Sequence, residues 1–159
     1  MSNFLKEEKI IISAKLLIYD RDQENFLIIQ RSLNHKHNPG LWELPGGKIT
    51  PSELIRVGLS REVMEETNLL TNLEDADIVT LDSRKIIDQN SSYNGFVINL
   101  LAAFINQSLD LNNIQLSHEH TDKQLIKINS NSWQKQELTP ETKLILEYFL
   151  DNIMENSYN

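Results

Sequence analysis

The sequence predicts a single domain of mixed α and β structure, arranged in layers around a sheet. Two observations support this prediction. Short apolar stretches typical of strands stand before and after one central helical pattern, and a second helical pattern comes near the C-terminus. The length of 159 residues suits one domain, which we place at residues 1–159. This order of elements predicts a mixed sheet in an α/β or α+β arrangement.

The first third of the chain is predicted to contain strands and tight connections. We expect strands over residues 10–19, 26–30 and 41–44. The first ends in the turn-like Asp20-Arg21-Asp22 and is expected to pair with the second as a hairpin. Residues 32–40 contain two Asn, two His, one Pro and one Gly, which predicts a loop. The third strand is expected to stop at Pro45-Gly46-Gly47.

A central helix is expected to begin soon after this turn. Thr50 suits the N-cap position, Pro51 suits the first helical position, and Glu53 completes a Thr-x-x-Glu capping box. The helical pattern runs to about Thr67. Asn68 then suits the left-handed conformation that ends many helices.

The second half of the chain predicts further strands and a terminal helix. We expect strands over residues 76–81, 84–87, 95–105 and 125–128. Residues 140–154 are predicted to form an amphipathic helix. Its apolar residues include Leu144, Leu146, Phe149 and Ile153.

The composition limits the possible classes of function. The net charge of −8 argues against a nucleic-acid polymer as partner, because such binding normally needs a basic surface. The absence of cysteine excludes disulfides, zinc–thiolate sites and thiol catalysis. No apolar stretch approaches the roughly 18 residues of a membrane span, and Ile10 to Ile12 is too short for a signal-peptide core. We therefore expect a cytoplasmic protein without a membrane partner.

Three carboxylates in the last turns of the central helix are arranged at a cost in stability. Glu62, Glu65 and Glu66 fall within about 100° of arc and continue an otherwise apolar side with Ile55 and Leu59. Like charges four residues apart repel, and acids near a helix C-terminus oppose its dipole at roughly 0.3–1 kcal/mol each. A divalent cation would reverse both effects, because Mg²⁺ and Mn²⁺ prefer clustered carboxylates. The alternative is a solvated acidic face, since Glu is a good helix former.

The turn before this helix favours the metal-binding interpretation. Gly46 and Gly47 allow the backbone to approach a ligand closely, and Lys48 follows as a cation beside it. A Gly-Gly pair alone indicates only a tight turn. The combination with three acids at the end of the next helix is much more specific.

These residues resemble a known motif. Gly47, five residues, Glu53, seven residues, and then Arg61-Glu62-Val63-x-Glu65-Glu66-x-x-Leu69 are similar to the Nudix box, over residues 47–69. Asn68 stands where the family has glycine, which is a mild departure because Asn tolerates the left-handed conformation. The preceding Leu-Trp-Glu-Leu-Pro-Gly-Gly-Lys also resembles the approach to the box in MutT-type members.

The resemblance implies a fold and a metal site. The fold is an α/β/α sandwich around a mixed sheet, and the reaction is attack by water on a diphosphate linked to another group. Glu62, Glu65 and Glu66 are implied to hold one to three Mg²⁺ or Mn²⁺ ions, with the Gly46 carbonyl as a further ligand. The catalytic acids are expected among Glu62, Glu66 and Glu119: Glu62 is the first candidate for the general base, and Glu119 is the second or else a surface acid.

The resemblance also implies supporting roles around the acids. Glu53 and Arg61 are expected to pair and so to position the acids, although Glu53 also has the capping role given above. Arg31 and Lys48 resemble phosphate-binding cations, or are plain surface cations. Other side chains are expected to be structural rather than ligands: Trp42 in the core, and His118 and His120 either exposed or structural.

The resemblance determines the reaction more closely than the substrate. The size and the approach to the box favour a nucleoside triphosphate, oxidised purines included, cleaved to the monophosphate and pyrophosphate. ADP-ribose or another nucleotide sugar is the close alternative, and a Nudix module that senses a nucleotide without hydrolysing it is an alternative of another class. Selectivity is expected from residues 32–40, 87–95 and those after Leu116. The chain is expected to act as a monomer or homodimer.

Overall fold

The computed structural model describes residues 9–86, 96–129 and 131–154. The strands are β1 (Lys9–Asp20), β2 (Asn25–Arg31), β3 (Trp42–Glu43), β4 (Gly46–Ile49), β5 (Asp77–Ile86), β6 (Phe96–Asn106) and β7 (His120–Lys127). The helices are α1 (Ile55–Thr67) and α2 (Pro140–Tyr148), with short 3-10 segments η1 (Leu111–Asn113) and η2 (Asn131–Lys135) and a π-helical segment η3 (Phe149–Met154).

The seven strands form one mixed sheet. Along its main path the order is β3-β2-β1-β6-β5, while β4 pairs with β1 and β7 pairs with β2. Strands β1 and β6 run parallel, and the other pairs are antiparallel. The long strand β1 changes neighbour along its length, because residues 12–15 pair with β4 and residues 19–20 pair with β2. The predicted mixed sheet is therefore confirmed.

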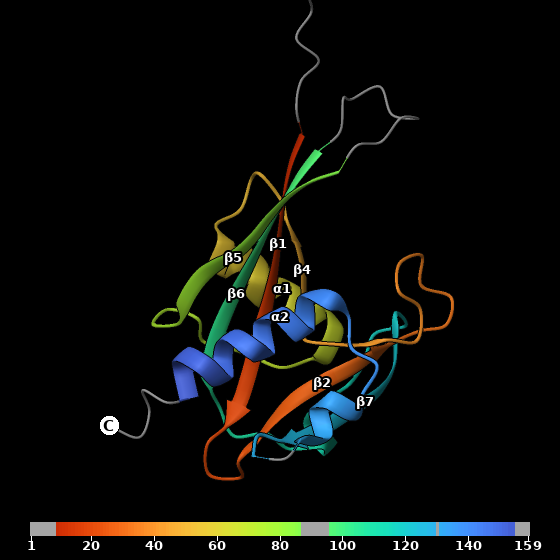
Figure 1. Cartoon of the computed structure of the whole chain (residues 1–159), viewed down its shortest axis with the longest axis vertical. Helices are drawn as coiled ribbons and strands as arrows, with labels where there is room; N and C mark the ends of the chain where they lie inside the picture. Colours follow the sequence, from red (N-terminus) through yellow and green to blue (C-terminus); the bar gives the residue numbers. More distant parts are fainter. Residues whose placement is uncertain (1–8, 87–95, 130, 155–159) are drawn as a thin grey trace, which may run out of the picture.

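The sheet separates two apolar cores, and each core is covered by one helix. Leu17, Leu100 and Phe104 pack with Ile145 and Phe149 on the side of α2. The alternating residues of the same strands point to the other side; these include Leu16, Ile18, Leu101 and Ala103, which pack with Leu59 and Val63 of α1. Figure 1 shows α2 crossing in front of the sheet and α1 behind it. This arrangement is the α/β/α sandwich that the resemblance implied.

The central helix begins later than the sequence predicts. Its N-cap is Leu54, which makes no side-chain cap hydrogen bond, and residues 50–53 form a turn instead. The backbone N–H of Thr50 donates to Oε1 of Glu53 at 2.9 Å, so half of the expected capping box closes that turn. The C-terminal end agrees with the prediction, because Asn68 has φ 61° and donates to the carbonyl of Met64.

The remaining elements agree with the predictions in kind and differ in extent. The Gly-Gly segment, expected as a turn, is strand β4. The two strands expected over residues 76–81 and 84–87 are one strand, β5, with a bulge between Thr80 and Asp82. Strand β7 begins at His120 and so is longer than the predicted 125–128. Residues 87–95, which include the end of one predicted strand and the start of another, lie outside the described residues.

The predicted C-terminal helix consists of an α-helical part, α2, and a π-helical part, η3. Thr139 caps α2 by accepting from the N–H of Thr142, and Pro140 occupies the first turn. The helix then widens into η3 from Phe149. Of the predicted apolar residues, Leu146 and Phe149 are buried, and Leu144 and Ile153 are partly buried against the same core. Within the part of the chain that the structure describes, no helix has the length and apolar character of a membrane span.

Candidate active site

Strand β4 brings the diglycine into close contact with both β1 and α1. Gly46 has φ 137°, and a Cβ atom there would lie 2.2 Å from the carbonyl oxygen of Ala14. A Cβ atom on Gly47 would lie 2.7 Å from Oε2 of Glu62. Gly46 therefore requires glycine, because its φ is positive and its backbone runs directly against β1, whereas a side chain at position 47 would have to displace the flexible end of Glu62.

Glu66 lies against this backbone and is almost fully buried. It is 6% exposed, and its Oε2 accepts a hydrogen bond from the N–H of Gly46 at 3.1 Å. Burial raises the pKa of Glu66 to about 7, because a carboxylate loses its hydration there. It forms no ion pair with any residue that the structure describes. Glu66 is thus a buried acid whose charge is not neutralised by a direct partner.

Next to it lies what we term the Arg61 cluster: Arg61 with Glu53, Glu62 and Glu65. The guanidinium contacts Glu53 at 2.8 Å, Glu62 at 3.1 Å and Glu65 at 3.2 Å. One cation therefore serves three carboxylates. Burial raises the pKa of Glu62, whereas the hydrogen bonds from Arg61 and then from the Thr50 backbone lower the pKa of Glu53 to about 2. The predicted pair of Glu53 and Arg61 is present alongside the turn-closing role of Glu53.

A second group of charges also reaches the diglycine strand, through Lys15, and we term it the Glu43 cluster: Glu43 with Lys15, Arg31 and His120. The carboxylate accepts from Nζ of Lys15 at 2.9 Å and from Arg31 at 2.7 Å. Its other oxygen lies 2.9 Å from Nε2 of His120. Burial raises the pKa of Glu43, but the Lys15 ammonium and the hydrogen bonds from His120 and Arg31 outweigh it and hold this pKa well below its usual range.

Two members of this cluster, Lys15 and Glu43, were not among the predicted site residues. Lys15 and Glu43 are 28 residues apart, and Glu43 and His120 are 77 apart, so no local spacing connects them. One signal was available. Lys15 interrupts a continuous apolar strand, and Glu43 stands between Trp42 and Leu44. Charged residues in buried strands are normally paired, so each predicted a partner elsewhere.

A cavity of about 470 Å³ is lined by all four members of the Glu43 cluster, by Glu66 and, from the Arg61 cluster, by Glu62. Of the predicted site residues, it is lined by Arg31, Gly46, Lys48, Glu62, Glu66 and Glu119. Glu65 does not line it; its side chain is 58% exposed and bound to Arg61. Within the described ranges, no three acidic or histidine side chains gather in a metal-binding geometry. Glu62 and Glu66 are therefore brought to the cavity together, and Glu65 is not.

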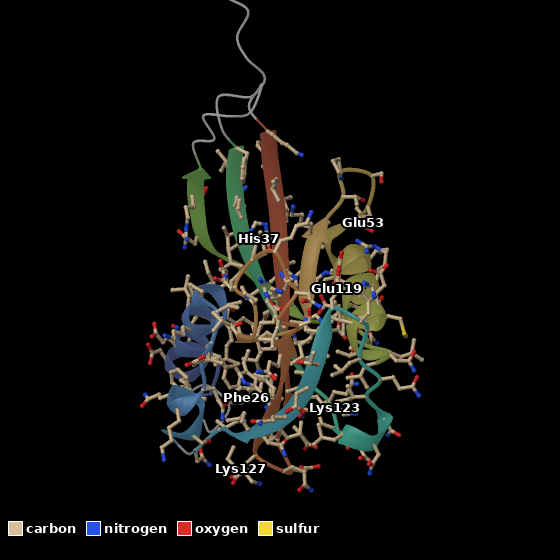
Figure 2. All side chains as sticks on the ribbon, turned by 90° about the vertical axis from the view of Figure 1, so that its right-hand side faces the viewer. Phe26, His37, Glu53, Glu119, Lys123 and Lys127 are labelled. Atoms are coloured by element: carbon tan, nitrogen blue, oxygen red, sulfur yellow. The ribbon has the colours of Figure 1, made fainter. Side chains whose placement is uncertain are left out.

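The remaining predicted residues lie around the rim or in the core. Glu119 is exposed in the loop before β7, and Figure 2 shows it at the end of that strand, with Glu53 above α1. His118 is exposed and His120 is buried against Glu43, as expected for an exposed and a structural histidine. Trp42 is 7% exposed and belongs to the core on the α2 side. Arg31 is tied to Glu43 and to the carbonyl of His37, whereas Lys48 is exposed.

Several solved structures have a similar fold. A MutT protein from Methanosarcina mazei Go1 is 24% identical, with 94% of this chain and 97% of that chain covered and a TM-score of 0.61. The E. coli ORF135 protein is 26% identical, with 91% of each chain covered and a TM-score of 0.62. A bifunctional NMN adenylyltransferase/ADP ribose pyrophosphatase from Francisella tularensis, complexed with AMP and a Mn ion, is 21% identical, with 94% of this chain and 43% of that chain covered and a TM-score of 0.62.

The family assignment rests on the sequence as well as on the fold. A comparison with curated proteins finds no match. The family model described as the NUDIX domain, however, matches residues 9–147, which include both charged clusters and both main helices almost entirely. Within the matched range, Glu53 and Arg61 form the pair that the motif implied, and Glu66 contacts the glycine strand β4. The chain therefore belongs to the Nudix hydrolase family.

Proposed function

We propose that this chain hydrolyses a phosphoanhydride bond in a nucleoside triphosphate and releases the monophosphate and pyrophosphate, with Mg²⁺ or Mn²⁺ as cofactor. The observation that best supports the proposal is the presence of both signs of charge in one cavity. Glu62 and Glu66 line it together with Lys15 and Arg31 of the Glu43 cluster. A polyphosphate with its metal ion needs both, because phosphate oxygens require cations and the metal requires anionic oxygen ligands.

The residues present suit a hard divalent cation. Glu66 offers a buried carboxylate without an ion-pair partner in the described part of the chain. The carbonyl of Gly46 belongs to the same residue whose N–H donates to Glu66. We assign the metal to Glu62, Glu65, Glu66 and that carbonyl. Glu65 would have to exchange its contact with Arg61 for the cation, since it points to Arg61 in this structure.

The chain's own residues divide the remaining work. When bound, the cation neutralises phosphate oxygens and lowers the pKa of the attacking water. Arg31 and Lys48 bind phosphate oxygens of the substrate. Glu62 is our first candidate to accept the proton of the water, because its pKa is raised by burial and it lines the cavity. Glu119 is the second candidate, and Arg61 with Glu53 positions the acids.

A second substrate class has one observation in its favour. Glu119 adds an acid at the cavity rim, beyond those of α1. An additional acid at this place suits ADP-ribose or another nucleotide sugar, in which the diphosphate joins two bulky groups. The structural relative from Francisella tularensis is named as an ADP ribose pyrophosphatase. The fold alone does not separate the two substrates, because function depends on the site.

A product-resolved assay tests the proposal. The chain is incubated with Mg²⁺ and, separately, with nucleoside triphosphates, ADP-ribose, nucleotide sugars and dinucleoside polyphosphates, and the products are separated by ion-exchange chromatography. We expect the fastest turnover with a triphosphate, and pyrophosphate rather than orthophosphate as the product. Glu66→Gln should lose activity by about 100-fold or more, since even residues behind a metal ligand are worth 10–100-fold.

The other outcomes have distinct meanings. Fastest turnover of ADP-ribose would replace the triphosphate with the second substrate class. Tight binding without turnover of any compound would make the chain a nucleotide-sensing module. Wild-type turnover in Glu66→Gln would remove that residue from the catalytic set.

A further inference from the structure

Lys15 is a buried lysine whose ammonium contacts the diglycine strand. It is 6% exposed and stands on β1, opposite Gly46 in the register of β1 and β4. Its Nζ donates to Oε2 of Glu43 at 2.9 Å and to the carbonyl oxygen of Gly46 at 3.2 Å. The same side chain lines the cavity. Lys15 therefore joins the Glu43 cluster to the backbone of β4.

The charge of Lys15 also reaches the acids of α1 that line the same cavity. It lowers the pKa of both Glu62 and Glu66, against the effect of their burial. The Gly46 N–H is bonded to Glu66 while the Gly46 carbonyl is bonded to Lys15. One residue of backbone thus lies between a buried acid and a buried ammonium. The carbonyl is the oxygen that the proposed function assigns to the metal.

We propose that Lys15 is a positioning residue that acts as a resident cation: its ammonium occupies the Gly46 carbonyl and thereby limits how many divalent ions the acids of α1 hold, and how tightly. This inference rests on the proposed function, because it presupposes a metal at Glu62 and Glu66. The physical reason is direct. An ammonium within a few Å of a divalent ion repels it, and a carbonyl that already accepts from Lys15 is a poorer ligand.

The consequence is a site with part of its positive charge built into the fold. A metal that uses the carbonyl must either share it with Lys15 or displace the ammonium, which stays attached to Glu43. The ammonium has a third N–H, beyond the two that Glu43 and Gly46 accept, and this donor remains available to a phosphate oxygen in the cavity. Lys15 would thereby hold the strand in place before any ion arrives.

Mn²⁺ binding without nucleotide tests this role apart from catalysis. Free Mn²⁺ is measured by electron paramagnetic resonance during titration of the wild type, Lys15→Met and Lys15→Gln. Methionine removes the charge and the donor, whereas glutamine removes the charge and keeps a donor for the carbonyl. Lys123→Met is the matched control: Lys123 is also partly buried on β7 and donates to the carbonyls of Leu111 and Ile114, but it does not line the cavity (Figure 2).

We expect both Lys15 variants to bind Mn²⁺ about tenfold more tightly than the wild type, or to bind one further ion, while Lys123→Met is unchanged. Circular dichroism and thermal melting confirm that each variant is folded. Wild-type or weaker Mn²⁺ binding in either Lys15 variant would overturn the inference, as would equal tightening in Lys123→Met. Absence of Mn²⁺ binding in all four proteins would overturn the metal assignment of the proposed function as well.

Discussion

The two clusters of charged side chains, of which the Arg61 cluster reaches the cavity only through Glu62, are built in opposite ways. In the Glu43 cluster one carboxylate is shared by Lys15, Arg31 and His120. In the Arg61 cluster one guanidinium is shared by three carboxylates. The first is enclosed, with the Glu43 side chain 3% exposed, and the second is open, with the Arg61 side chain 36% exposed.

The difference teaches which charges need a further ion. The buried cluster has two cations, Lys15 and Arg31, for one carboxylate, and all three line the cavity. The open cluster, together with Glu66, has more carboxylates than cations. Such an excess is unfavourable until a further cation binds. The cations of the buried cluster therefore suit phosphate, and Glu62 and Glu66 suit a metal ion.

The largest effect on stability is expected at the centre of the buried cluster. Glu43→Gln leaves Lys15 and Arg31 in a buried site without their shared anion. We expect a loss of about 3–5 kcal/mol in the free energy of unfolding, measured by urea denaturation. The matched change in the open cluster, Glu53→Gln, should cost far less, because water can solvate Arg61. Equal losses in the two variants would contradict the contrast drawn between the clusters.

The stability of the protein should depend on pH through Glu66, the buried acid that has no ion-pair partner among the described residues. Glu66 has a folded pKa of about 7 against an ordinary value of 4.5, so the folded state binds its proton more tightly. In metal-free protein its contribution to stability is full below pH 4.5 and is lost as the pH rises through 7, by about 3 kcal/mol. Glu43 and Glu53 act in the opposite sense, because their pKa values are lowered in the folded state. Their contribution to the stability of the protein is lost as the pH falls below 4.5.

Thermal melting without metal checks this prediction. The melting temperature should be highest near pH 5 and should fall towards pH 8 in the wild type. Glu66→Gln should flatten the fall between pH 5 and 8, and Mg²⁺ should reduce it in the wild type. A wild-type melting temperature that rises from pH 5 to pH 8 without metal would exclude an uncompensated Glu66.

A smaller effect is expected from weakening the open cluster while keeping its charge. Arg61→Lys retains the cation but loses the fork that contacts three carboxylates at once. We expect turnover to fall by roughly tenfold, in the range found for residues that orient metal ligands, with little change in the free energy of unfolding. Steady-state kinetics beside urea denaturation separates the two. A large loss of stability with unchanged turnover would show that Arg61 is structural only.

The smallest effect concerns the end of the helix on which the open cluster stands. Asn68 has φ 61°, so Asn68→Ala should destabilise the protein by about 1 kcal/mol, whereas Asn68→Gly should cost little or nothing. Urea denaturation of both variants checks this. A larger cost for glycine than for alanine would show that the Asn68 side chain, and not its backbone conformation, is what matters there.

The parts of the fold that follow from local patterns were predictable from the sequence. The strand at residues 10–19, the end of α1 at Asn68 and the start of α2 at Pro140 each depend on neighbouring residues. The predicted start of α1 was wrong, because Glu53 does not begin the helix. Its carboxylate accepts from Arg61 and packs over Gly58 instead. Strand β4 was missed because its pairing with β1 depends on residues more than 30 positions away.

The candidate site divides in the same way. Glu62, Glu65 and Glu66 are close in sequence, so the motif identified them directly. Their different orientations could not be predicted, since these depend on Arg61 and on the backbone of Gly46. Lys15 and His120 reach Glu43 only through the pairing of strands. The segment 87–95, expected to contribute to selectivity, lies outside the described residues.

The central claim is that a divalent ion binds between the acids of α1 and the diglycine strand. Anomalous diffraction from a crystal soaked in Mn²⁺ tests it most directly, because the signal locates the ion itself. We predict an anomalous peak within bonding distance of carboxylate oxygens of Glu62 and Glu66, beside Gly46. A crystal with Mn²⁺ at other sites, no peak there and Glu66 bonded only to the Gly46 N–H would contradict the claim.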